Sequence, residues 1–166
     1  MQIHQVIYTL SPYKALGINH IPNVVLIKCY NVLIDHLISI FRAIFEHRVC
    51  HPWWLKSTTL VLQKIGKPAY EVAKAYCPIG LIDTILKVFS MLCAKHLSYL
   101  AENHAMLPLT QFGGRPGRNT MDAMLLVAHK IKDAWRRSKT AVALFLDNQG
   151  AFPNTMKDQL LHNMRM

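Results

Sequence analysis

The chain has 166 residues, of which 52% are hydrophobic and 17% are charged. That length is typical of a single domain, and so apolar a composition excludes an intrinsically disordered chain. Lysine and arginine number 19 against 9 aspartates and glutamates, which gives a formal net charge of +10. A basic excess of this size favours a polyanionic partner, with nucleic acid ahead of an acidic membrane.

Cysteine spacing, the N-terminus and the apolar segments argue against four other classes of protein. The four cysteines form no CxxC pair, so neither a disulfide scaffold nor a zinc site is supported. The N-terminus lacks the basic region and the cleavage site of a signal peptide. Charges at helical spacing interrupt the longest apolar stretch, residues 24–45, which predicts a core helix instead of a membrane span. We therefore expect an intracellular protein of the nucleus or cytoplasm.

In the first part of the chain, the pattern predicts two helices and two extended segments. Residues 11–22 are rich in turn formers, and the helix that follows ends near His51-Pro52, because proline lacks a backbone donor. Residues 58–62 predict a strand, and a second extended segment spans about 75–81. Asp83 is placed to cap a helix that runs to about His104.

Beyond the glycine- and arginine-rich loop at 111–118, the pattern predicts a helix, a strand and a further helix. Asn119 and Asp122 favour a helix start, and this helix runs to about Arg137. Residues 140–146 are uncharged and mostly apolar, which is typical of a buried central strand. Residues 156–166 predict the start of another helix. The 119–137 helix is expected to bury its apolar side chains, namely Met121, Met124, Leu125, Ala128, Ile131 and Trp135.

Asp147 stands at the carboxyl end of the predicted central strand. A carboxylate at the edge of a core is costly unless it is paired or binds a cation. Periodicity alone favours the alternative, an aspartate that opens the turn 147–150. The next carboxylate along the chain, Asp158, is eleven positions further on, so this segment cannot build a two-carboxylate metal site by itself.

Two basic segments are candidates for binding phosphate. Residues 115–139 carry seven basic and two acidic side chains, and Arg115 and Arg118 lie in a glycine-rich turn that suits phosphate oxygens. A solvated face is the usual interpretation of the helical part of this segment. Lys64 and Lys67 flank a glycine in a weaker companion site, for which a merely soluble turn is an even alternative.

Four sequence blocks resemble those of reverse transcriptases from non-LTR (LINE-type) retrotransposons, in the order that this family has them. They lie at residues 11–23, 64–81, 111–120 and 145–152, and the closest resemblance is to the fungal branch of these elements. The resemblance implies an α+β fold: the fingers and partial palm of a right-hand polymerase, helix-rich with a β-hairpin and one central palm strand. Within one partial domain over 1–166, residues 11–139 would be fingers-like and 140–166 the start of the palm.

The resemblance also implies roles for single residues. Asp147 would be a catalytic carboxylate and a ligand of the Mg²⁺ ions that carry nucleotidyl transfer to the 3′-hydroxyl of a DNA primer. Phe152 would pack under the incoming sugar and select deoxynucleotides. Lys64 and Lys67 would lie near the nucleotide triphosphate. The block expected to hold the RNA template contains Gln111, Arg115 and Arg118.

The chain departs from the family pattern in four ways. Cys77 replaces an arginine, residues 18–20 replace Pro-Asp-Gly so that a tight turn should be lost, and Pro153 stands where many members have a second aspartate. The later palm motif with paired aspartates has no counterpart, and neither has a thumb. The sequence therefore predicts a truncated reverse transcriptase domain that is inactive alone. The alternatives are a non-catalytic basic nucleic-acid-binding protein and a translation that never accumulates in folded form.

Overall fold

The computed structural model of the chain describes residues 2–148 and 151–165, apart from the side chains of Gln2, Phe152 and Pro153. It divides into two compact units, residues 1–108 and residues 109–166. The structure is helix-rich with one two-stranded antiparallel sheet among the described residues, as expected for an α+β fragment. None of the helices in this described part is long and apolar enough to cross a membrane.

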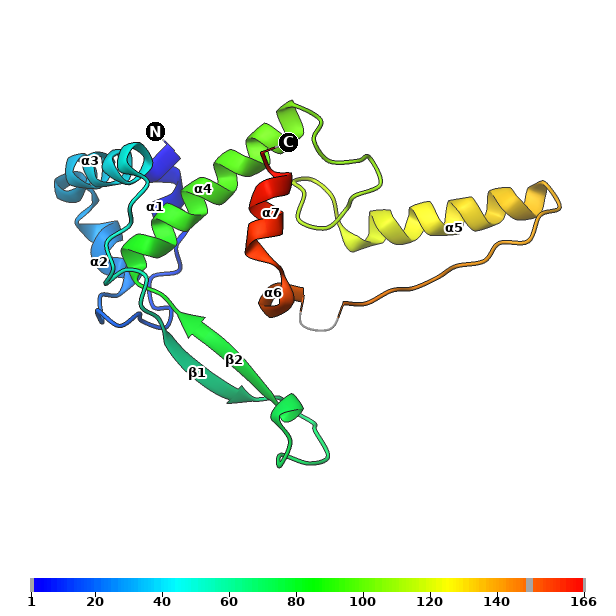
Figure 1. The fold of residues 1–166 in the computed structure, drawn as a ribbon, viewed down its shortest axis with the longest axis horizontal. Coiled ribbons are helices and arrows are strands. Elements are labelled where there is room, and N and C mark those ends of the chain that lie inside the picture. Colours follow the sequence, from blue (N-terminus) through cyan, green and yellow to red (C-terminus); the bar gives the residue numbers. More distant parts are fainter. Residues whose placement is uncertain (1, 149–150, 166) are drawn as a thin grey trace. The chain divides into compact units, whose positions relative to one another are not determined.

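The core of the first unit is formed by four helices, which Figure 1 shows gathered around the start of α4. They are α1 (Gln2–Thr9), α2 (Asn23–Lys28), α3 (Tyr30–His47) and α4 (Thr84–Asn103). The ring of Phe89 on α4 lies 5.3 Å from that of Phe41 and 5.2 Å from that of Phe45, both on α3, centre to centre. The buried apolar residues that hold the helices together are Val6, Ile7, Leu10, Leu26, Leu37, Phe41 and Val88.

The helix predicted to run from about residue 24 to His51-Pro52 is present, but it is divided in two and ends at His47. Cys29 leaves helical geometry, with φ −93° and ψ 12°, and separates α2 from α3. Arg48 has a left-handed backbone with φ 56°, which ends α3 before His51-Pro52 is reached. The stop signal is therefore a local C-cap and not the proline.

Both predicted extended segments are confirmed as the strands of a hairpin. β1 (Thr58–Gln63) pairs antiparallel with β2 (Tyr76–Leu81), and a 3₁₀ turn, η1 (Ala73–Ala75), precedes β2. Pro78 lies opposite Val61, a position that proline tolerates because each strand of a two-stranded ribbon is an edge. The hairpin extends from the start of α4 (Figure 1).

Asp83, at the junction of β2 and α4, holds the opening segment of the chain. Its side chain is 3% exposed and makes no capping hydrogen bond to α4, contrary to the prediction. Instead, its Oδ1 atom accepts a hydrogen bond from the backbone N–H of Asn19, at 3.1 Å. The neighbouring Thr84 hydroxyl donates to the carbonyl of Ile21, at 2.6 Å. The segment 11–22 is thus fastened to the first turn of α4.

The tight turn that the sequence predicted to be lost is present at residues 17–20. The N–H of His20 donates to the carbonyl of Gly17, at 3.1 Å. His20 has φ 55°, a left-handed conformation that glycine adopts at a lower cost. The fold around Asp83 therefore imposes this turn on a residue that does not favour it.

Replacing Gly17 by alanine is expected to lower the free energy of unfolding by about 1–3 kcal/mol, a typical cost of overpacking. A Cβ atom there would lie 2.6 Å from Asp83 Oδ1 and from the Ile82 carbonyl, closer than these atoms can tolerate. The measurement is urea unfolding followed by tryptophan fluorescence. Gly80→Ala is the matched control, since a Cβ at Gly80 meets nothing within 4 Å. Equal stability of both variants would contradict this packing.

The second unit contains α5 (Thr120–Arg136), α6 (Ala151–Asn154) and α7 (Lys157–Asn163). The predicted start of α5 is confirmed as a reciprocal cap. The Asn119 side chain accepts from the N–H of Asp122, and the Asp122 carboxylate accepts from the N–H of Asn119, both at 3.0 Å. Such a capping box satisfies two backbone donors that the helix leaves without partners.

Two predictions for the second unit are wrong. None of the α5 residues is buried, and Met124 and Trp135 are 61% and 66% exposed. Residues 140–146 are extended but form no strand, and Phe145 is 86% exposed, so the central palm strand is absent from the described residues. A strand requires a neighbouring chain segment to receive its hydrogen bonds, and the described residues provide none here.

Candidate functional site

The loop at the tip of the hairpin is held in shape by its own side chains. Lys64 Nζ donates to the carbonyl of Lys74 at 3.1 Å, and the Tyr70 hydroxyl donates to the carbonyl of Lys64 at 3.0 Å. The Tyr76 hydroxyl donates in turn to the Tyr70 carbonyl at 3.0 Å, and the two tyrosine rings meet edge to face. Lys67 is exposed on the same loop. The result is a fixed, positively charged tip suited to anions.

The hairpin tip contains two residues that sequence reasoning missed. Tyr70 and Tyr76 order the loop that carries the predicted Lys64 and Lys67. Tyr70 lies in the irregular tip and Tyr76 is the first residue of β2, so no strand or helix pattern links the two. The fold of the irregular segment between β1 and β2 brings the two rings together.

The arginine-rich loop of the second unit is organised around Arg118. Its guanidinium donates to the backbone carbonyls of Leu109 and Gln111 and lies over the ring of Phe112, 5.3 Å from the ring centre. The Gln111 side chain donates to the carbonyl of Gly113, at 3.0 Å. The side chains of Gln111 and Arg118 therefore both donate hydrogen bonds to backbone carbonyls of their own segment.

Arg115 and Arg118 are the first and last residues of one turn. The N–H of Arg118 lies 3.4 Å from the Arg115 carbonyl, and Pro116 and Gly117 occupy the two central positions. Gly117 has φ 70°, the left-handed value that a type II turn requires at its third residue. The turn places Arg115 on a defined backbone, and an arginine guanidinium can bind phosphate through two hydrogen bonds.

Replacing Arg118 by alanine is expected to speed amide hydrogen exchange across residues 109–118, because the carbonyl contacts of the guanidinium are lost. Arg118→Lys should do the same, since an ammonium group lacks the planar fork that reaches two carbonyls. Hydrogen exchange read by mass spectrometry measures this. Arg136→Ala, which removes an arginine from the end of α5, is the control and should leave the loop unchanged. Unchanged exchange in Arg118→Ala would show that the loop does not depend on this side chain.

Asp147 is exposed and lines a cavity of about 390 Å³. The side-chain oxygen atoms that line the cavity belong to the Asp147 carboxylate, two asparagine amides and the hydroxyl of Thr155. This hydroxyl donates a hydrogen bond to the Ala151 carbonyl. Oxygen atoms of this kind suit Mg²⁺. Among the described residues that line the cavity, none comes from the loop 111–118. The lining residues are Asp147, Asn148, Ala151, Asn154 and Thr155.

The residues around Asp147 do not by themselves fit a two-metal site. Such a site holds two cations about 3.5–4 Å apart and needs several carboxylates to do so. In the part of the chain that the structure describes, no three His, Cys, Asp or Glu side chains gather closely enough to hold a metal ion. Asp147 can therefore be one ligand of a metal site but not the whole of it. The side chain of Phe152 lies outside the described part.

The cysteines are free thiols, of which Cys29 and Cys77 are exposed. Burial raises the pKa of the Cys93 thiol, which reduces the fraction of reactive thiolate at neutral pH. Cys93 lies half-buried on α4.

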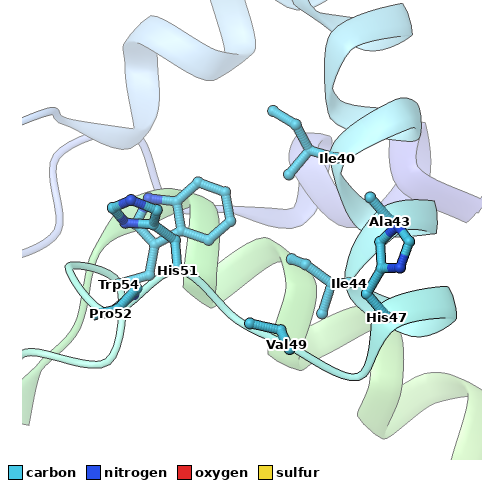
Figure 2. A pocket seen from close by; sticks show the side chains of 8 residues that line it. All are labelled: Ile40, Ala43, Ile44, His47, Val49, His51, Pro52 and Trp54. Carbon is cyan, nitrogen blue, oxygen red and sulfur yellow. The ribbon is translucent and has the colours of Figure 1, made fainter.

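An apolar cavity of about 700 Å³ in the first unit was not predicted from the sequence. Figure 2 shows the side chains of α3 on one side of it and those of the loop that follows α3 on the other. Apart from two imidazoles, the lining side chains are apolar or an indole, which suits an apolar group and not a phosphate. The lining residues are Ile40, Ala43, Ile44, His47, Val49, His51, Pro52 and Trp54.

Two transposon proteins of Drosophila melanogaster are similar to almost the whole chain. The chain is 28% identical to the probable RNA-directed DNA polymerase from transposon BS over 164 residues, which is 99% of the chain. It is 31% identical to the probable RNA-directed DNA polymerase from transposon X-element over 151 residues, or 91% of the chain. No family model matches the chain.

The chain spans less than a fifth of the length of these relatives, 18% of the first and 16% of the second. The similarity supports the predicted resemblance to transposon reverse transcriptases, since these are RNA-directed DNA polymerases. Both relatives come from an insect, and they give no support to the predicted placement in the fungal branch.

Proposed function

We propose that the chain is part of the reverse transcriptase of a LINE-type retrotransposon and contributes the fingers and the first part of the palm. The observation that carries the proposal is that two transposon RNA-directed DNA polymerases align with 91% and 99% of the chain, at 31% and 28% identity. The net charge of +10 supports it, because a polymerase must hold the phosphate backbones of template and primer. Residues 11–139 would belong to the fingers and 140–166 to the palm.

The two basic loops are the proposed nucleic-acid and nucleotide contacts. Lys64 and Lys67 at the hairpin tip would bind the triphosphate of an incoming deoxynucleotide. Arg115 would bind the backbone of the RNA template, and Arg118 would act by holding the turn that carries it. Gln111 belongs to the same template block. The fixed backbone of both loops supports this assignment, because a preordered site loses less entropy when it binds.

Asp147 is the proposed catalytic carboxylate of this chain, and Phe152 the proposed residue that selects against a 2′-hydroxyl. Mg²⁺, when bound, would supply the positive charge that stabilises the transferring phosphoryl group. Among the described residues that line its cavity, Asp147 has only neutral oxygen atoms beside it, so in this proposal the remaining carboxylates come from other segments of the polymerase. The 166-residue chain alone is then a binding fragment and not a competent polymerase.

A non-catalytic nucleic-acid-binding protein is the second candidate. The lack of a metal-binding cluster in the described residues favours it, as does the density of positive charge in residues 115–139. Both candidates bind the sugar-phosphate backbone without reading base sequence. They differ in whether Asp147 takes part in catalysis within a larger assembly.

Binding of single-stranded RNA is expected to weaken steeply as salt concentration rises. Each phosphate contact adds about 0.7 to the slope of log affinity against log salt, since binding releases condensed counterions. Arg115→Ala should lower that slope by about one contact, and fluorescence anisotropy over a salt series measures it. The matched control is Arg42→Ala, which removes the same charge from the exposed face of α3. A slope that stays the same in Arg115→Ala would exclude this turn from the interface.

The purified chain is expected to give no Mg²⁺-dependent extension of a primed RNA template, because the transition state lacks most of its electrostatic stabilisation. A primer-extension gel is the measurement, with RNA binding followed in parallel to show that the protein is folded. Extension that disappears in Asp147→Asn but persists in Asp158→Asn would refute the proposed inactivity and would assign catalysis to this chain.

A further inference from the structure

The irregular tip of the hairpin, residues 64–75, is a surface loop that buries almost none of its side chains. Figure 1 shows it beyond the ends of β1 and β2, with η1 at its end. Residues 64–74 are exposed, and only Ala75 in this segment is buried. Because so little apolar surface is removed from water here, hydrogen bonds and not hydrophobic packing fix the shape of the tip.

Two tyrosines close the tip into two consecutive loops, 64–70 and 70–76. The Tyr70 hydroxyl donates to the carbonyl of Lys64 and the Tyr76 hydroxyl to the carbonyl of Tyr70, both at 3.0 Å. Each hydroxyl thus reaches a carbonyl six residues earlier in the chain. The aromatic rings meet edge to face with their centres 6.2 Å apart, so the two closures support each other.

The first of these loops carries both lysines that are candidates for binding a triphosphate. Lys67 lies at its middle, after Gly66, whose φ of 79° is a left-handed value. Lys64 begins the loop, and its Nζ atom donates to the carbonyl of Lys74 at 3.1 Å. An ammonium group has three donors, so two of those of Lys64 remain for a ligand. Closing the loop at Tyr70 therefore holds the backbone that carries both cations.

We propose that Tyr70 is a positioning residue for triphosphate binding, held in turn by Tyr76. This inference rests on the proposed function of Lys64 and Lys67 and adds a requirement to it. The Tyr70 hydroxyl acts on the Lys64 carbonyl and does not itself touch the ligand. Without that bond the exposed loop 64–70 would sample many shapes, and binding would have to order it at a cost in entropy.

The test is a titration of the full chain with thymidine triphosphate, without Mg²⁺, followed by NMR chemical shifts. Tyr70→Phe keeps the ring and removes only the hydroxyl. It is expected to weaken binding about three- to tenfold, the range that corresponds to one net hydrogen bond. Tyr76→Phe should weaken binding less, because it acts on the Lys64 carbonyl only through Tyr70. Amide hydrogen exchange over residues 64–75 should become faster in both variants.

A salt series separates positioning from direct contact with the ligand. Lys67→Ala removes a charge, so it should weaken binding and also flatten the dependence of affinity on salt. Tyr70→Phe removes no charge, so the salt dependence should stay that of wild type while the affinity falls. In the Lys67→Ala background, Tyr70→Phe should weaken binding by a smaller factor than in wild type, because part of its effect passes through Lys67.

Two controls separate the tip from the rest of the chain. Tyr99→Phe makes the same change on an exposed tyrosine of α4 and should leave triphosphate binding unaltered. The tip lies outside the buried core of the first unit, so the urea unfolding midpoint of Tyr70→Phe should match that of wild type. RNA binding should also be unchanged in Tyr70→Phe, since the template contacts are assigned to the loop at 111–118.

The possible failures point to different assignments. Wild-type binding that needs Lys67 but ignores the Tyr70 hydroxyl would overturn this inference and leave the proposed function of the tip intact. A wild-type chain that binds no triphosphate would refute that proposed function, and the inference with it. A changed salt dependence in Tyr70→Phe, or a loss of RNA binding, would also overturn the inference, because Tyr70 would then contact a ligand or belong to a nucleic-acid site.

Discussion

The first unit depends on one buried carboxylate, that of Asp83. A buried charge is costly unless hydrogen bonds compensate for the lost water, and Asp83 accepts the backbone N–H of Asn19. The close approach of Gly17 and the left-handed turn at His20 follow from this contact. Because Asp83 joins β2 to α4, the same contact fastens the base of the hairpin to the opening segment of the chain.

The two basic loops are built on the same principle, although they lie in different units. In each loop a long cationic side chain donates hydrogen bonds to backbone carbonyls. Lys64 donates to that of Lys74, and Arg118 donates to those of Leu109 and Gln111. These contacts order the loops before any ligand arrives. A preordered loop with positively charged side chains suits a polymer of phosphates, whose spacing is regular and whose base sequence varies.

In the second unit, an apolar run and a candidate metal ligand both lack neighbouring partners among the described residues. Its apolar run 140–146 lacks a neighbouring strand, and Asp147 at the end of that run lacks neighbouring carboxylates among the described residues. Both deficits have the same physical origin. Strand pairing and two-metal sites are made between segments, so one segment cannot supply them by itself.

Local rules were sufficient wherever the decisive partners are close in sequence. The sequence by itself determined the strands of the hairpin, the Asn119–Asp122 cap and the Pro116-Gly117 turn, because their interactions act within a few residues or along one ribbon. Only the tertiary structure decided that Asp83 would bind the segment 11–22 and that the apolar side chains of α5 and of residues 140–146 would stay exposed. Burial depends on what covers a surface, and periodicity in one segment carries no information about a partner distant along the chain or absent from it.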